Sequence, residues 1–191
     1  TILMASGAKY LKTDDDMMKM LPRELESKLA WDAIQEEFGN TEIIYLAFGN
    51  NDSKALSTKT LGHLWELTDE LGKLPSVNNV INLSTTSRID HSDGLLEFKP
   101  LQSSKIVDNE DLEEIRIYLK KNPKLKKQLI SNNYDFLLTI VQPNENVGLD
   151  LFRNGIVSVA DSILQEYKIY YAGTAYITGS FPELIKTDIT S

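Results

Sequence analysis

The sequence predicts an α+β domain in which two strand–helix–strand units form one sheet, and three observations lead to this prediction. Residues 43–48 form an unbroken apolar run, which is the composition of a strand buried on both faces, and residues 136–141 form a second, mainly apolar strand pattern. Each run is followed by a segment whose apolar residues recur at helical spacing, at 58–74 and 152–167. Each of these helices is followed in turn by a second strand.

Two such units in one chain predict a ferredoxin-like split βαβ fold, which is a four-stranded sheet with two helices on one face. In this topology the first strand of each half lies in the middle of the sheet, which agrees with the two apolar runs. The chain of 191 residues is about twice as long as such a domain needs. We therefore expect one compact domain made of an N-terminal helical segment (1–40), a first half (41–84), an insertion (85–133) and a second half (134–191).

The N-terminal segment is expected to hold two helices. Residues 14–16 are aspartates, which suit a helix start because their carboxylates accept hydrogen bonds from free N–H groups. A metal site is the alternative, but it would need further oxygen ligands at calcium-loop spacing, and none follows. Pro22 suits the first turn of a second helix, which Gly39-Asn40 ends. The apolar stripe of this helix comprises Leu25, Leu29, Ala33, Ile34 and Phe38.

A cluster of methionines near the start of the chain is the candidate contact site. Met17, Met18 and Met20 carry flexible thioether side chains, which line adaptable surfaces for hydrophobic substrates or partners. Ordinary core packing is the competing interpretation and the commoner one. The sequence thus proposes these three residues for a hydrophobic contact without deciding between the two roles.

The two halves and the insertion are delimited by proline and glycine. Pro75 ends the first long helix, and Gly173 after the last strand suggests a bulge or a close approach of two backbones. The insertion is expected to start with a short edge hairpin, followed by a helix that Asp108 or Asn109 caps and that ends before Pro123. A run of lysines there complements the negative helix end and solvates a turn, and a binding patch is the alternative. These lysines are Lys120, Lys121, Lys124, Lys126 and Lys127.

Strand 43–48 is apolar on both of its sides, yet two helices on one face of a split βαβ sheet leave the other face open. Apolar side chains on that face would otherwise meet water. We therefore expect the second face to be covered by the insertion, by the N-terminal helices or by another domain.

Composition excludes several classes of function. A formal net charge of −8 argues against nucleic-acid binding, because phosphate contacts need clustered Lys and Arg. The chain has no cysteine, which excludes disulfides, thiolate nucleophiles and zinc–thiolate sites. The chain contains no run of about 18 apolar residues, so the sequence predicts no membrane span. Because the chain starts at Thr1, we expect it to be a soluble piece of a longer product.

We expect no enzymatic activity and no cofactor. His63 and His91 have no acidic residue or second histidine at ligand spacing, and such histidines are usually structural. The sequence lacks the Gly-x-Ser-x-Gly, Walker and Gly-x-Gly-x-x-Gly patterns, and no arginine lies in a Gly-rich loop after the first strand. Asn82-Leu83-Ser84 matches the glycosylation tripeptide, but it falls in a predicted strand and carries no weight.

Several short patterns are informative as an ordered set. They are Met20-Leu21-Pro22, Glu37-Phe38-Gly39, the strand 43–48, the run 74–84, Asp93-Gly94-Leu95, Asp111-Leu112, Asn122-Pro123 and Tyr171-Ala172-Gly173-Thr174. In this order, over about residues 15–180, the chain resembles the large extracytoplasmic loop of exporters of the resistance-nodulation-division (RND) superfamily. The resemblance is to their MMPL or hydrophobe-exporter branch.

The resemblance implies a porter-type domain on the periplasmic or extracellular side of the membrane, held between two transmembrane helices of an integral membrane protein. Exporters of this kind move lipids or other hydrophobic molecules, driven by proton flow through acidic residues of the membrane part. The domain would form part of the substrate passage. Its partners would be the transmembrane region and a second porter-type domain of the same transporter, which would pack on the open sheet face.

An extracytoplasmic module that binds or senses a small ligand is the alternative. The sequence on either side of the chain discriminates the two, because a transporter loop is bracketed by membrane spans. An enzyme is a distant third possibility, for want of a site.

Overall fold

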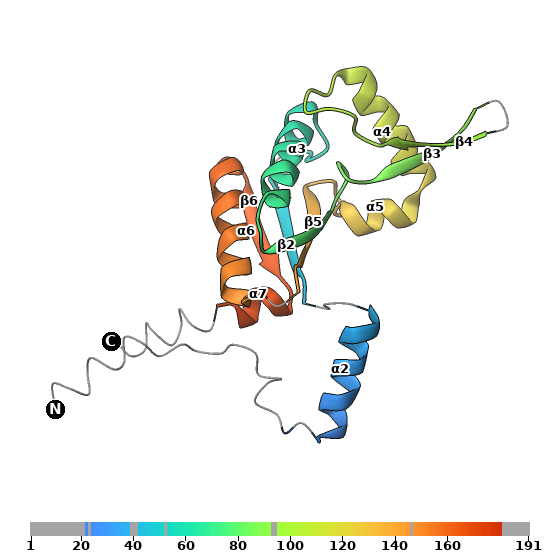
Figure 1. Ribbon diagram of the computed structural model, residues 1–191. Coiled ribbons are helices and arrows are strands. Elements are labelled where there is room, and N and C mark those ends of the chain that lie inside the picture. Colours follow the sequence, from blue (N-terminus) through green and yellow to red (C-terminus); the bar gives the residue numbers. More distant parts are fainter. Residues whose placement is uncertain are drawn as a thin grey trace.

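The computed structural model describes residues 22, 24–38, 42–51, 53–92, 95–145 and 147–180. Within these ranges the chain is α+β, as predicted, with a four-stranded antiparallel sheet, a separate two-stranded sheet and six helices (Figure 1). The elements in chain order are α2 (Glu26–Phe38), β1 (Ile44–Gly49), α3 (Thr58–Gly72), β2 (Val77–Ile81), β3 (Ser87–Ser92), β4 (Leu95–Pro100), α4 (Asn109–Lys121), α5 (Pro123–Leu129), β5 (Phe136–Pro143), α6 (Leu149–Ile163), β6 (Lys168–Ala172) and α7 (Thr174–Thr178).

The main sheet has the strand order β2-β5-β1-β6, and each neighbouring pair is antiparallel. The two most apolar strands, β1 and β5, occupy the middle of the sheet, as the sequence indicated. Ile44, Leu46 and Phe48 of β1 are fully buried, and every second residue of β5 from Leu137 onward is buried as well. Because side chains alternate along a strand, this pattern assigns one face of the sheet to the core.

Helices α3 and α6 lie against each other and cover the core face (Figure 1). α3 begins after Ser57, whose side chain accepts a hydrogen bond from the backbone N–H of Thr60, 3.2 Å away. The inward side of α3 is made of leucines at helical spacing, and that of α6 of apolar residues that become smaller along the helix. The fully buried members are Leu61, Leu64, Leu67, Leu71, Phe152, Ile156 and Ala160.

The insertion contains the predicted hairpin and helix and one further helix. β3 and β4 pair with each other, but they form a sheet of their own instead of an edge of the main sheet. α4 is capped by Asp108, whose side chain accepts hydrogen bonds from the N–H groups of Glu110 and Asp111. Pro123, expected only beyond the end of a helix, starts the additional helix α5. The lysine run therefore spans two helices and not one helix end and a turn.

The insertion is anchored to α3. Gln102 is buried, and its Nε2 atom donates hydrogen bonds to the carbonyl oxygens of Leu61 (3.0 Å) and Ser104 (2.9 Å). Arg116 of α4 donates to the carbonyl oxygen of Leu56, 3.3 Å away, just before α3 begins. These hydrogen bonds hold the insertion beside α3 and the segment that precedes it.

The second half differs from expectation at its ends. α6 covers 149–163 instead of the predicted 152–167, and α7 was not predicted at all. Gly173, between β6 and α7, is a close-approach point as the sequence suggested. Its φ is 110°, and a Cβ atom there would lie 2.2 Å from the Ile43 carbonyl oxygen.

A buried polar cluster directs the chain from β2 toward the hairpin. Asn82 is fully buried, and its Nδ2 atom donates to the hydroxyl oxygens of Thr68 (2.8 Å) and Thr139 (3.3 Å). Its Oδ1 atom accepts from the backbone N–H groups of Ser84 (2.9 Å) and Thr85 (3.3 Å). A side chain bonded inside the protein in this way is inaccessible to glycosylation in the folded chain.

Candidate interaction surface

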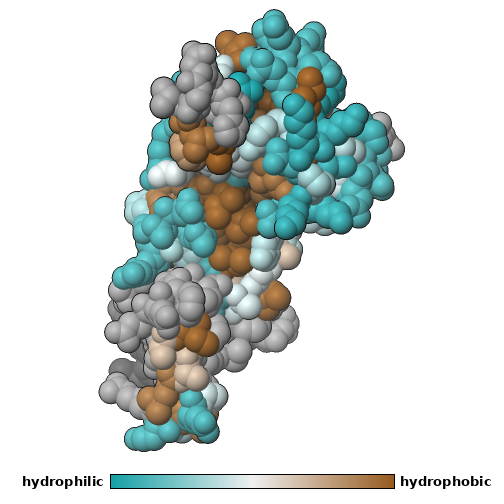
Figure 2. All heavy atoms as spheres, turned by 90° about the vertical axis from the view of Figure 1, so that its right-hand side faces the viewer, coloured by the Kyte–Doolittle hydropathy of each residue, from teal (hydrophilic) through white to brown (hydrophobic). Residues whose placement is uncertain are grey.

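The second face of the main sheet is apolar, and the elements that the structure describes leave it largely uncovered. We call it the open face. Tyr170 keeps 56% of its surface exposed, and Tyr45 and Ile81 keep 36% and 37%. Figure 2, which views the molecule from the right-hand side of Figure 1, shows a continuous apolar area at the centre of this side. The members of the open face are Tyr45, Ala47, Ile81, Phe136, Leu138, Ile140, Tyr170 and Ala172.

Strand register arranges these residues in rows across the sheet. Phe136 and Tyr170 meet edge to face, with 5.5 Å between their ring centroids. Lys168, at one end of the face, is the only charged residue of the rows. The rows are Ile81, Ile140, Tyr45 and Ala172, then Leu138, Ala47 and Tyr170, then Phe136, Gly49 and Lys168.

Two of the three covers expected from the sequence do not lie on the open face in the described residues. The insertion is anchored to α3 through Gln102, and Leu112 and Ile115 of α4 are buried in the core. Helix α2 stands clear of the sheet (Figure 1), and Leu25, Leu29 and Ile34 keep between 42% and 57% of their surface exposed. Residues 1–21 of the N-terminal segment lie outside the described residues, so both this part of the segment and another domain remain as expected covers of the open face.

Positive charge borders one end of the open face. Helix α5 lies beside the start of β5, because Ile130 at the end of this helix forms a β-bridge with Leu137. Lys126 of α5 places its Nζ atom 4.0 Å from the centroid of the Tyr134 ring. Lys168 lies in the row of the open face nearest this end. The surface therefore combines an apolar centre with a border of lysines at this end, where Asp135 pairs with Lys54 at 3.6 Å.

A polar cluster lies elsewhere, where α3 meets the segment after α6. His63 Nδ1 is 3.0 Å from the Tyr167 hydroxyl oxygen and 3.4 Å from Glu166 Oε1. Glu166 also forms a hydrogen-bonded ion pair with Lys59. The hydrogen bond from Lys59 holds the pKa of the Glu166 carboxyl below its ordinary value. Burial raises the pKa of the Tyr167 hydroxyl. Because these groups are bound to one another, the cluster ties α3 to the chain after α6, while His91 lies in β3.

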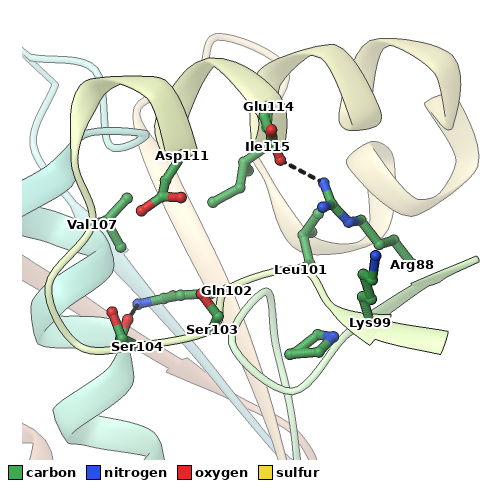
Figure 3. A pocket seen from close by; sticks show the side chains of 11 residues that line it. Arg88, Lys99, Leu101, Gln102, Ser103, Ser104, Val107, Asp111, Glu114 and Ile115 are labelled. Atoms are coloured by element: carbon green, nitrogen blue, oxygen red, sulfur yellow. Dashed lines mark hydrogen bonds and ion pairs between the residues drawn. The ribbon is translucent and has the colours of Figure 1, made fainter. Parts of the chain in front are cut away.

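A cavity of about 260 Å³ lies between the hairpin and α4 (Figure 3). Arg88 Nη1 pairs with Glu114 Oε2 across it at 2.8 Å, and Gln102 Oε1 accepts a hydrogen bond from Ser84 Oγ at 2.7 Å. Small-molecule sites usually measure about 300–1,000 Å³. The size and the internal pairing of its polar groups mark this cavity as the joint between the hairpin and α4.

The residues proposed from the sequence as a contact site, Met17, Met18 and Met20, lie outside the described residues, so that assignment stays a prediction. The sequence does not identify the individual residues of the open face. Their signal was present in the apolar character of strand 43–48 at both parities. The sequence could not place the partner elements, because strand register and the course of the insertion decide which face is covered.

Among the described residues, no group of acidic or histidine side chains is placed to hold a metal ion. No helix in the same ranges is long and apolar enough to cross a bilayer. No protein-family model matches the sequence, and no curated protein matches it significantly.

Proposed function

We propose that this chain is an extracytoplasmic, porter-type domain of a proton-driven exporter of the RND superfamily, in its MMPL or hydrophobe-exporter branch. In this proposal the open face packs against a second porter-type domain of the same transporter. The observation that carries the proposal is an apolar, largely uncovered face on a sheet whose other face already has two helices. A contiguous apolar patch of this kind marks an interaction site in a protein that is otherwise well packed.

The proposal includes the ferredoxin-like split βαβ fold. The strand order β2-β5-β1-β6 supports it, as do the two units β1-α3-β2 and β5-α6-β6. Two helices on one face leave the opposite face available to a neighbour. A second domain would then pack on this sheet face, while α3 and α6 lie on the other side of the sheet.

The domain itself carries out no chemistry in this proposal. The membrane part of the transporter supplies proton coupling, and the domain lies on the periplasmic or extracellular side, where a lipid or other hydrophobic substrate passes. Aromatic residues such as Tyr45 and Tyr170 suit a face that borders this passage, because the ring is apolar while the hydroxyl tolerates water.

A small-ligand or sensor module is the second candidate, and one observation favours it. A cavity of about 430 Å³ lies beside α4 and is within the usual size range of ligand sites. It combines apolar walls with basic side chains, which would suit an apolar molecule with an anionic group. Its lining comprises Lys54, Leu56, Arg116, Leu119, Lys120 and Tyr134.

The first test is to read the gene on both sides of residues 1 and 191. The exporter proposal expects an apolar run of about 20 residues on each side and a second half that repeats the same plan. Stop codons or soluble domains on both sides would refute it and leave the ligand-binding module as the better account.

The second test uses the intact exporter. Tyr170→Asp places a charge on the open face, at the most exposed of its aromatic residues, and we expect it to reduce efflux of a hydrophobic dye to the background level. Ser158→Asp is the matched control, because Ser158 is an exposed residue on α6, on the other side of the sheet. Equal efflux from both variants, at equal amounts in the membrane, would contradict the role of the open face.

A further inference from the structure

The chain exposes a second apolar surface besides the open face, on helix α2. Leu25, Leu29 and Ala33 follow each other at four-residue spacing across the start of this helix and so lie on one side of it. All three are exposed in this structure. One molecule therefore presents both an apolar helix side and an apolar sheet face that its described elements leave largely unpartnered.

We propose that two copies of this chain associate by exchange, with α2 of each copy lying on the open face of the other. The proposal deepens the proposed function, because it names the element through which two domains of the same plan meet. The exchange proposal rests on the proposed function in one respect, namely that the partner domain has the same fold as this chain.

The dimensions of the two surfaces match. A helix of 13 residues is about 20 Å long at 1.5 Å per residue. The central strand β1, with six residues, also spans about 20 Å. A helix of this length covers the open face along its strands without extending far beyond the apolar rows.

The charges of the two surfaces are complementary. Residues 24–38 contain five acidic residues and one lysine, whereas residues 120–127 contain five lysines and no acidic residue. The second stretch includes α5, which borders the open face, and Lys168 lies on the face itself. An acidic helix on this face is attracted by its border, while a basic helix would be repelled.

The placement of α2 favours a second copy as the source of the helix. α2 leads toward the central strand β1, yet it stands away from its own sheet (Figure 1). In this arrangement the described elements of the same molecule leave its apolar side uncovered, and a second copy offers an open face that fits it. Reciprocal exchange uses the same two surfaces on both copies, so the association closes at a symmetric dimer and does not continue into a filament.

The absence of cysteine from the chain allows a sharp test by disulfide formation. Tagged Leu29→Cys protein is mixed with untagged Tyr170→Cys protein in a glutathione redox buffer, and the mixed disulfide is quantified on a non-reducing gel. Only a contact between two molecules can form it. We expect at least about tenfold more of it than in a mixture of Leu29→Cys with Ser158→Cys, which lies on the outer side of α6.

Sedimentation of the unsubstituted chain is the second measurement, and it does not depend on cysteine variants. We expect a monomer–dimer equilibrium, in which Leu29→Asp weakens association by more than about tenfold. Because Leu29 is exposed, circular dichroism should show the folded state of the variant unchanged.

Two outcomes would overturn the exchange. One is an intramolecular disulfide in the Leu29→Cys/Tyr170→Cys double variant of a monomeric chain, which would place α2 on its own sheet. The other is a monomer at every concentration with no mixed disulfide above the control. Neither outcome bears on the exporter proposal, which the flanking gene sequence and the efflux assay test separately.

Discussion

Replacing Asn82 by alanine should destabilise the fold far more than its position at the end of a strand suggests. The side chain is fully buried and makes four hydrogen bonds within the protein. Without it the buried N–H of Ser84 has lost its acceptor, which costs about 1–3 kcal/mol. The other three bonds contribute about 0.5–1 kcal/mol each, because the Thr68 and Thr139 hydroxyls rotate toward other partners and the N–H of Thr85 is only partly buried. We expect the free energy of unfolding to fall by about 3–5 kcal/mol in total.

The same strand offers a matched control. Asn79 of β2 also donates through Nδ2 to a side-chain oxygen, Gln142 Oε1, at 3.1 Å, but this pair is exposed. Asn79→Ala should therefore cost about 0.5 kcal/mol or less. Urea unfolding followed by circular dichroism measures both variants, and equal m-values would show that the difference lies in stability. If Asn82→Ala were no more destabilising than Asn79→Ala, the buried cluster would not hold the chain as argued here.

Three further predictions concern backbone conformation and pH. Gly173→Ala should lower the free energy of unfolding by at least about 2 kcal/mol, because its φ of 110° is unfavourable for alanine and the added Cβ collides with a backbone carbonyl. Gly72→Ala, where the added atom meets nothing within 4 Å, should instead be neutral or stabilise by up to about 1 kcal/mol in the same assay. Carbon-13 NMR should show the Glu166 carboxyl titrating below its ordinary pKa, and Lys59→Gln should raise that pKa. The stabilisation from this ion pair is present above the ordinary pKa of a glutamate and is lost as pH falls through the lowered one.

Much of the main sheet could be predicted because its signal is local and repeated. The central strands are an unbroken apolar run at 43–48 and a mainly apolar run at 136–141, and antiparallel pairing then needs only their alternation to assign a core face. The same holds for α3, where leucines at helical spacing give the buried stripe and a serine provides the cap. These features depend on residues that are close to one another in the sequence.

The missed elements depend on distant contacts. α5 and α7 have seven and five residues, which is too short for apolar periodicity to be distinguished from a turn. Each is held by residues that pack into the core, Leu129 in α5 and Ala175 in α7. The hairpin was predicted as a pair of strands, but its separation from the main sheet follows from the buried cluster around Asn82, which redirects the chain after β2.

The open face shows where composition stops being sufficient. Apolar residues at both parities of a strand are equally consistent with a sheet buried on two sides and with one that keeps an interaction surface. Within β1, however, the two parities differ: Ile44 and Leu46 point to the core, whereas Tyr45 points to the open face. Tyrosine tolerates partial exposure because its hydroxyl stays hydrated while its ring is covered, so its position favours a face that meets a partner over one closed during folding. Tyr170 in β6 lies beside Ala47 of β1 on the same face, and the two partly exposed tyrosines support the proposed interface over a second core.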